Sequence, residues 1–381
     1  MSGLVRVVLV ALSLLACAAS EAHKPSDSYL TLTLPQSSPV LQGRWDIALR
    51  DLDHALGLDL NQDGAITWGE LKARQSAVVA YALSRLTIQA IARGDRQPCS
   101  LAFIQMLVDE HVDGNYAVLR FTADCGLRPA QLVLHYALLF DVDPTHRGLV
   151  EINANGIHQA AVLPLVAATT TIDLTAVDRW QQFRGFVREG IWHIWKGFDH
   201  ILFLLTLLFP AVVLSRGGGW QPRPSLRAAA LDVVRVITAF TLAHSLTLSL
   251  AVLGLAQLPS RLVESAIAAT VLLGALNNLW PVVHRRRWLV AFVFGLVHGF
   301  GFAAVLADLG LQGLNLALAL VGFNSGVEVG QVAIVLVVLP VAFVLRHTIV
   351  YRRAFMPAGA VAISAIATYW LVARVTGAGL G

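Results

Sequence analysis

The stretch EGIWHIWKGFDHILFLLTLLFPAVVL, residues 189–214, decides how this chain must fold. It is apolar over a length that can cross about 30 Å of hydrocarbon at about 1.5 Å per helical residue. Yet the stretch carries His193, Asp199 and His200. An ionisable side chain at a bilayer centre costs at least about 3 kcal/mol, and those that persist usually mark a substrate path or an ion site. The stretch therefore predicts a membrane helix that contributes to a buried polar site.

Five further apolar runs follow this stretch, and the composition agrees with a membrane protein. The runs cover residues 233–256, 262–283, 288–308, 315–345 and 356–375. The chain of 381 residues is 56% hydrophobic and 14% charged, whereas a soluble domain carries roughly a quarter charged residues. We therefore expect an α-helical polytopic membrane domain of six transmembrane helices over 189–376, with the long fifth run tilted or kinked near Pro340.

Arginine residues predict the orientation of these helices. If the N-terminal region lies outside the cytoplasm, alternating crossings place nine arginines in inner loops and two in outer segments. The nine are Arg216, Arg223, Arg227, Arg285, Arg286, Arg287, Arg346, Arg352 and Arg353, and the two are Arg261 and Arg374. This satisfies the positive-inside rule and places the C-terminus in the periplasm. The pI near 9.2 then reflects topology and predicts no nucleic-acid partner.

Polar residues recur near the middle of the other runs. His244, His298 and Glu328 fall at about the depth of His200 if each run is a helix. His193 and His200, seven residues apart, are expected on one helical face. Six residues form the predicted membrane metal site: His193, Asp199, His200, His244, His298 and Glu328. The supporting polar residues are Lys196, Thr241, Ser245, Glu264, Asn324 and Gln331. Lys196 is expected either to extend toward the membrane surface or to pair with Asp199 or Glu264.

The residue types in this cluster restrict the ion. Imidazole and carboxylate groups suit Ni²⁺, Co²⁺, Zn²⁺ or Cu²⁺, and the predicted spans contain no thiol to favour a softer ion. The spacing of Gly295 and Gly299 around His298 predicts close approach of a neighbouring helix. We therefore expect this cluster to form a buried site that binds a divalent metal ion or a proton.

The N-terminus is typical of an export signal, predicted over residues 1–22. Arg6 precedes an apolar run at 7–16, and small residues follow up to Ala22. The residues around Cys17 also resemble a lipobox, in which Cys17 would be lipidated. If cleavage follows Ala22, His23 would either chelate a metal or remain unused.

Residues 23–176 predict an exported, mostly β domain that resembles a sandwich. Short alternating segments separated by turn residues support this, at 29–34, 101–108, 116–123, 131–140 and 170–174. An oxidising compartment favours a disulfide between Cys99 and Cys125, and the alternative is two buried thiols. Residues 177–188 are expected to form a linker helix, either at the bilayer surface or packed on the domain.

A helical insert at about 44–92 is expected to interrupt the β pattern. It contains DLNQDGAITWGE, residues 59–70, which fits the EF-hand loop at each diagnostic position. The predicted calcium ligands are Asp59, Asn61, Asp63, the Ala65 carbonyl, Thr67 and Glu70. Helices at 45–57 and 71–84 would flank the loop. We expect bound Ca²⁺ with a structural rather than a signalling role, because the sequence shows no second loop to pair with this one.

Four motifs of the membrane region jointly resemble the HupE/UreJ family. They are His193-xxx-Gly197-x-Asp199-His200, FTLAHSLTL at 240–248, GLVHGFGF at 295–302 and FNSGVEVGQ at 323–331. The resemblance covers roughly 185–376, and the exported domain resembles N-terminal extensions on one branch of the family. It implies a bacterial inner-membrane protein with a hydrogenase or urease accessory role and nickel or cobalt uptake. Ile194 replaces the proline of many relatives, which leaves open whether the first span bends.

The resemblance favours a divalent-metal permease over an enzyme. His193 would receive the ion near the outer surface, the other ligands would hold it at the midplane, and Glu328 would balance charge or exchange protons. Two other uses stay open. One is an intramembrane zinc-dependent hydrolase that uses Ser245 and a metal-activated water. The other is a non-transporting metallocentre accessory protein or sensor whose exported domain binds a periplasmic partner.

Overall fold

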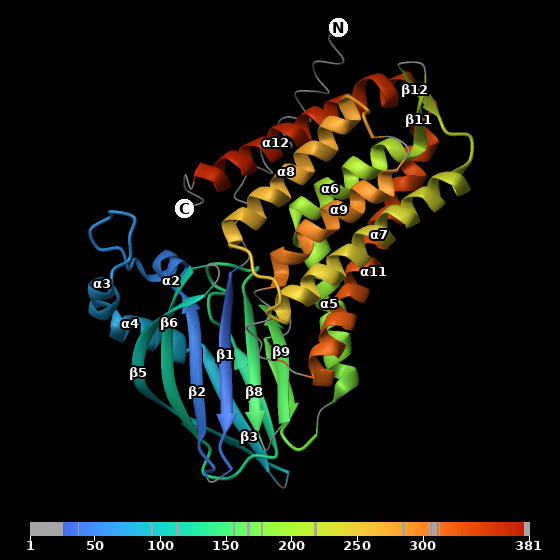
Figure 1. The fold of residues 1–381 in the computed structure, drawn as a ribbon. Coiled ribbons are helices and arrows are strands. Elements are labelled where there is room, and N and C mark those ends of the chain that lie inside the picture. The colour runs from blue at the N-terminus through green and yellow to red at the C-terminus, as the bar shows by residue number, and fades with distance from the viewer. Residues whose placement is uncertain are drawn as a thin grey trace. The chain divides into compact units, whose positions relative to one another are not determined.

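The computed structural model describes residues 26–376 except 37, 93, 112–113, 155–156, 166–167, 177, 217–218, 284–285, 304–305, 307–310 and 312. The chain separates into two compact units. One consists mainly of Lys24–Gly185, and the other of Phe186–Ala304 with Leu320–Gly381. Figure 1 shows strands in the first unit and helices in the second. The predicted export signal, Cys17 and His23 lie outside the described residues.

Strands of the first unit form two sheets. The larger sheet has the order β5-β6-β2-β1-β8-β9 and the smaller one the order β10-β7-β3-β4. The strands are β1 Asp27–Leu34, β2 Leu41–Ala48, β3 Leu86–Ala92, β4 Asp95–Pro98, β5 Ser100–His111, β6 Gly114–Asp124, β7 Gln131–Tyr136, β8 Arg147–Ala154, β9 Ile157–Pro164 and β10 Thr169–Asp173. Strands β1 and β8 pair in parallel. The predicted N-terminal β-rich domain is confirmed.

The core of this unit contains side chains from both sheets. Trp45 of β2 and Tyr136 of β7 are fully buried, and their ring centroids lie 5.6 Å apart. Leu30 of β1 and Ile88 of β3 belong to the same apolar cluster. Because a large apolar side chain contributes roughly 1.5–3 kcal/mol on burial, these inward faces hold the sheets together.

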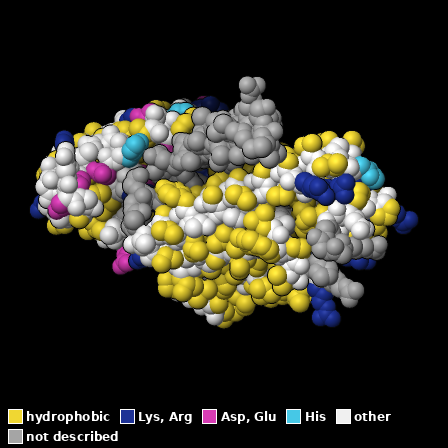
Figure 2. Space-filling model, turned by 90° about the horizontal axis from the view of Figure 1, so that it is seen from above, with side chains coloured by type: hydrophobic (Ala, Val, Ile, Leu, Met, Phe, Trp, Pro, Cys, Tyr) yellow, Lys and Arg dark blue, Asp and Glu magenta, His cyan; other side chains and the backbone are white. Residues whose placement is uncertain are grey.

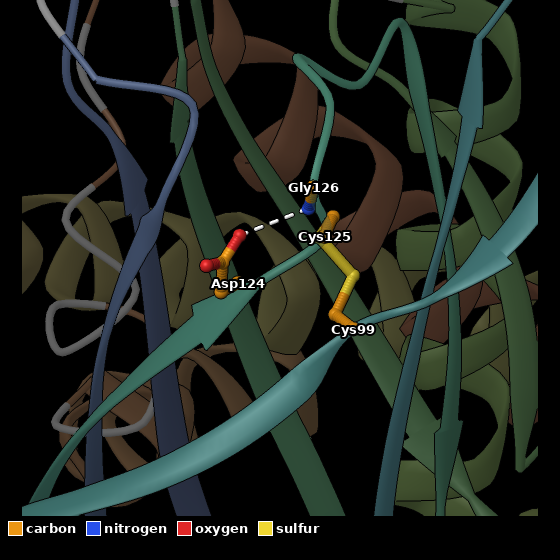
Figure 3. The surroundings of a disulfide bond; sticks show 4 residues. All are labelled: Cys99, Asp124, Cys125 and Gly126. Atoms are coloured by element: carbon orange, nitrogen blue, oxygen red, sulfur yellow. Dashed lines mark hydrogen bonds between the residues drawn. A yellow bond between two sulfur atoms is a disulfide. The ribbon is translucent and has the colours of Figure 1, made fainter.

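A disulfide joins the segment before β5 to the segment after β6. Cys99 and Cys125 are bonded through their sulfur atoms. Figure 3 shows this bond beside Asp124, whose Oδ1 accepts a hydrogen bond of 2.9 Å from the Gly126 amide. The bond ties together the ends of two strands that already pair along their length.

The helical insert is shorter than the predicted range 44–92. The entering helix was predicted to begin at Trp45, which is wrong because Trp45 lies in strand β2. Residues 41–47 alternate between the two faces of strand β2, which pairs with β1 and β6. Position 43 of this strand is a glycine because a Cβ there would overlap the ring of Phe121. The helices are α2 Leu49–Leu56, α3 Trp68–Ala73 and α4 Gln75–Leu83. The predicted exiting helix is therefore in two pieces.

The second unit is built from apolar helices. Its elements are α5 Arg179–Lys196, α6 Phe198–Leu208, η2 Phe209–Val212, β11 Val213–Arg216, β12 Gly219–Pro222, α7 Leu226–Val252, α8 Ser260–Leu279, α9 Arg287–His298, η3 Gly299–Phe302, α11 Gly313–Leu345, η4 Tyr351–Phe355 and α12 Met356–Thr376. Large apolar side chains such as Leu242, Leu336 and Val344 are more than 60% exposed. Figure 2 shows hydrophobic side chains over much of the face of this unit that it presents. Such a surface suits a lipid environment.

Four described helices are long and apolar enough to cross a membrane: α7, α8, α11 and the Tyr351–Thr376 helix. A fifth span results if α5 and α6, which meet at a bend of 71°, count as one. The run expected at 288–308 contains the shorter apolar helix Arg287–Phe302, and several residues beyond it are not described. The helical, membrane-type region is thus confirmed, whereas the sixth span and the orientation stay predictions.

Candidate metal site in the helical unit

Four histidines from four helices lie in a row. The ring centroids are 6.3 Å apart for His244 and His193, 4.5 Å for His193 and His200, and 5.2 Å for His200 and His298. His200, His244 and His298 are buried. The structure therefore brings together histidines from three separate sequence motifs.

The bend between α5 and α6 places His193 beside His200. A straight helix would separate residues seven apart by about 10 Å along its axis. The two histidines, predicted on one helical face, instead lie on two helices that meet at a bend of 71°. The chain turns at Gly197, where a Cβ would lie 2.6 Å from His200 Nδ1 and 2.8 Å from the His193 carbonyl oxygen. The span thus bends although position 194 is isoleucine.

Glycines allow the helices that carry the site to approach closely. A Cβ at Gly326 of α11 would overlap the carbonyl oxygen of Val187 on α5. A Cβ at Gly295 of α9 would overlap the carbonyl oxygen of Phe240 on α7, and Gly299 is equally confined. Small residues are typical of such membrane-helix interfaces. The close approach predicted at Gly295 and Gly299 is confirmed.

Each of the three buried histidines has one ring nitrogen in contact with a neighbouring polar side chain. The contacts are Asp199 Oδ1 to His200 Nδ1 at 2.9 Å, Asn324 Oδ1 to His244 Nδ1 at 3.2 Å, and Thr270 Oγ1 to His298 Nε2 at 2.9 Å. Metal-binding histidines commonly have such a partner on the nitrogen that does not bind the metal, because it fixes the ring orientation and tautomer. Sequence reasoning missed Thr270, since a threonine in an apolar helix usually bonds only its own backbone.

The opposite ring nitrogens are buried without a partner. His200 Nε2, His244 Nε2 and His298 Nδ1 have no hydrogen-bond partner within the described residues. A buried polar atom left unsatisfied costs roughly 1–3 kcal/mol, and these three nitrogens are chemically able to bind a ligand or a water molecule. A lone pair on neutral imidazole is what a transition metal binds.

Phenylalanine rings enclose the histidines. Phe302 and Phe323 stack at 4.3 Å, and their centroids lie 4.8 and 5.2 Å from His193. Phe203 and Phe240 each lie 5.3 Å from the ring of His298. These rings exclude water and lower the local dielectric, which strengthens electrostatic interactions inside the cluster.

Three predicted site residues lie outside this cluster. Glu328 is exposed on α11, because it projects about 40° to one side of Asn324 at 3.6 residues per turn. Lys196 is exposed, with Nζ 5.6 Å from the Trp192 ring centroid. Glu264 approaches Arg374, with Oε2 3.8 Å from Nε.

The remaining supporting residues bond near the cluster. Thr241 donates a hydrogen bond of 3.2 Å to Gln331 Oε1, and both side chains are buried. Ser245 donates to the Thr241 carbonyl oxygen at 2.7 Å. The Ser245 hydroxyl is therefore engaged by its own helix, as is common for serine in membrane helices.

The cluster is not a rigid ligand cage. Among the residues that the structure describes, no three His, Cys, Asp or Glu side chains are arranged to hold a metal ion. Neighbouring rings in the row have centroids 4.5–6.3 Å apart, but their nitrogens are not directed to one point. A bound ion would therefore be accompanied by local rearrangement.

A cavity of about 430 Å³ lies between α6, α8 and α9. Its polar side chains are bonded to protein: Thr206 donates to the Phe203 carbonyl oxygen, and Asn278 donates to the Thr206 carbonyl oxygen. Arg287 at its edge lies 3.0 Å from Asp232 Oδ2. A cavity with satisfied polar groups and a cationic rim suits a divalent cation poorly.

The predicted calcium loop lies in the first unit. Asp59 Oδ2 accepts from the Gly64 amide at 2.9 Å, and Gly64 has φ +81°, which favours glycine. Glu70 closes the loop, accepting from the Leu60 and Thr67 amides at 3.0 and 2.9 Å. These bonds from Thr67 and Leu60 lower the pKa of Glu70. Asp59 Oδ1 is buried without a hydrogen-bond partner in the described part of the chain.

The helices and the buried histidines define a polytopic membrane protein with a polar site inside its helical unit. The sequence matches the family described as HupE / UreJ protein over residues 169–374, which is more than half of the chain. The chain belongs to this family, as its four motifs predicted. No curated protein matches it.

Proposed function

We propose that the helical unit is an inner-membrane permease for a divalent transition-metal ion of the nickel or cobalt type, with the β-rich domain in the periplasm. The observation that carries this proposal is the set of buried imidazole nitrogens without partners on His200, His244 and His298. Their other nitrogens contact Asp199, Asn324 and Thr270. A substrate ion would bind the former nitrogens while the latter contacts orient the rings.

The interrupted helix supports transport. Helix α5 ends at Lys196 and α6 begins at Phe198, directly beside the histidine row. Membrane transporters commonly place helix ends at ion sites, where the C-terminal carbonyl groups carry partial negative charge. Asp199, whose Oδ1 lies 2.9 Å from His200 Nδ1, adds a formal negative charge. The carboxylate favours a cation in this place.

The loose arrangement of the site favours a permease over the zinc-dependent hydrolase. A catalytic zinc is held by three protein ligands with one open position, and the described residues contain no such preformed group. A transported ion must leave the site again, so its binding must be weak enough for release. The hydroxyl of Ser245, the candidate nucleophile, bonds the carbonyl oxygen of Thr241.

Uptake of radiolabelled nickel or cobalt by cells or vesicles tests the proposal. We expect His200→Ala and His244→Ala each to reduce uptake to background, because each removes a ligand from the row. His347→Ala is a matched control, since His347 is an exposed histidine of the same unit. Uptake that continues unchanged in both site variants would overturn the proposal.

We also propose that the exported domain binds Ca²⁺ at residues 59–70. The loop supplies oxygen donors in EF-hand order, and the Asp59 carboxylate has a buried oxygen without a hydrogen-bond partner among the described residues. Isothermal titration of the full-length protein should show one calcium site, lost in Glu70→Gln and kept in Asp95→Asn. Absence of calcium binding by the wild-type protein would end this part of the proposal.

A further inference from the structure

We propose that Thr270 is a positioning residue that holds His298 in a single tautomer and so directs its Nδ1 lone pair to the metal. This inference deepens the proposed function and rests on it. Thr270 lies on α8, which contributes no ligand to the predicted site. It is 5% exposed, so its hydroxyl must find its partners inside the protein.

The direction of each hydrogen bond follows from counting protons. Thr270 Oγ1 lies 2.6 Å from the Ile267 carbonyl oxygen and 2.9 Å from His298 Nε2. A carbonyl oxygen only accepts, so the single hydroxyl proton of Thr270 is directed to Ile267. Thr270 Oγ1 must then accept from His298, whose Nε2 carries the ring proton. The neutral ring therefore has its lone pair on Nδ1.

The deprotonated nitrogen is the one that lies free inside the cluster. His298 Nδ1 is buried and without a hydrogen-bond partner in the described residues. The ring of His298 is 5.2 Å from that of His200 and 5.3 Å from that of Phe240. The opposite tautomer would direct an N–H into this enclosed space and oppose a cation.

The same logic applies to the other two buried histidines. The Asp199 carboxylate accepts a hydrogen bond from His200 Nδ1. Asn324 uses its amide nitrogen to donate to the Leu320 carbonyl oxygen at 2.9 Å, which leaves Oδ1 to accept from His244 Nδ1. Both rings then have lone pairs on Nε2, the atoms without partners. Thr270 is thus the third member of a set of acceptors, one for each buried ring.

Three variants separate this role from a packing role. Thr270→Val keeps the shape but removes the acceptor, whereas Thr270→Ser keeps the hydroxyl. Thr247→Val is the matched control, because Thr247 is also buried and its hydroxyl donates to the carbonyl oxygens of Ala243 and His244, with no contact to a histidine ring among the described residues. Loss of an outer partner of a metal ligand typically weakens metal affinity by about 10–100-fold.

Nitrogen-15 NMR of histidine-labelled full-length protein in detergent reads the tautomer directly, with His298 assigned by comparison with His298→Gln. We expect Nε2–H in the wild type, Thr270→Ser and Thr247→Val, and a mixture of tautomers in Thr270→Val. Nickel titration should show the 10–100-fold loss only in Thr270→Val. An unchanged tautomer or unchanged nickel affinity in Thr270→Val would overturn the inference. If the wild type bound no nickel, the proposed function would fail, and the NMR spectra would still decide whether Thr270 sets the tautomer.

Discussion

His146 in the β-rich unit and His298 in the helical unit are both buried, yet their ring nitrogens differ in what they contact. His146 Nδ1 contacts Ser26 Oγ, and its Nε2 lies 2.6 Å from Tyr136 Oη. Ser28 and Trp45 extend this chain of hydrogen bonds. His298 has a partner on Nε2, while its Nδ1 has none within the described residues. Both ring nitrogens of His146 contact protein groups, whereas His298 Nδ1 is available to bind a ligand.

The difference separates a structural histidine from one available to a ligand. Burial lowers the pKa of His146 from 6.5 to about 3, and burial also raises the pKa of Tyr136 well above its usual range. Both side chains are therefore neutral near pH 7, and their hydrogen bonds stabilise the junction of the two sheets. A fully satisfied network fixes one conformation, and an incompletely satisfied one is expected where a ligand binds.

The largest expected effect comes from breaking the saturated network. His146→Ala removes the partner of Tyr136 and Ser26 and leaves a cavity, so we expect a loss of about 3–5 kcal/mol in the free energy of unfolding of the β-rich unit. Amide hydrogen exchange on the full-length protein measures this, with lower protection in β1, β7 and β8. Full protection of these strands in the variant would contradict a structural role for His146.

The pH dependence of stability sharpens the same contrast. Below pH 6.5 the unfolded chain protonates His146, but the folded protein resists protonation until about pH 3. The stabilisation is therefore complete above pH 6.5 and decreases as pH falls toward 3, by at most about 1.4 kcal/mol per pH unit. Exchange protection of β1 and β8 at pH 7, 6 and 5, corrected for intrinsic rates, should show this slope. His146→Gln should reduce it, and a slope identical in both proteins would assign it to other groups.

An intermediate effect is expected in the helical unit. Asp199→Asn keeps an oxygen near His200 Nδ1 but removes the charge, so nickel affinity should fall by about 10–100-fold. Competition titration with a metal-binding dye measures this loss. Asp178→Asn is the control, because Asp178 caps the start of α5 through the Trp180 and Gln181 amides. Equal affinities in the two variants would remove Asp199 from the site.

The smallest effect is expected for Glu328, which the sequence predicted as a ligand or proton acceptor. Its side chain is exposed, whereas Asn324 is half-buried and Gln331 is buried. Glu328→Gln should therefore change nickel affinity by less than about 3-fold, well below the effect expected when a partner of a metal ligand is lost. A loss as large as that of Asp199→Asn would restore Glu328 to the ligand set.

Sequence reasoning located five of the ten strands of the first unit and the four histidines, but it missed how several of these residues are positioned. Alternation and apolar length report burial directly, so β1, β5 and β6 and the long helices were predictable. The turn at Gly197 was not, since glycine within an apolar run is compatible with a continuous helix. Trp45 fits both helical and strand spacing, and only pairing with β1 and β6 decides between them. Thr270 depends on a tertiary contact across two helices, which no local pattern encodes.

X-ray absorption at the nickel edge of the full-length protein tests the central claim most directly, which is that the histidine nitrogens without protein partners bind the substrate ion. The account predicts imidazole scattering around nickel in the wild type and in His146→Ala, with reduced imidazole scattering in His200→Ala and His244→Ala. A nickel environment made only of oxygen, or one that is the same in all four proteins, would contradict it.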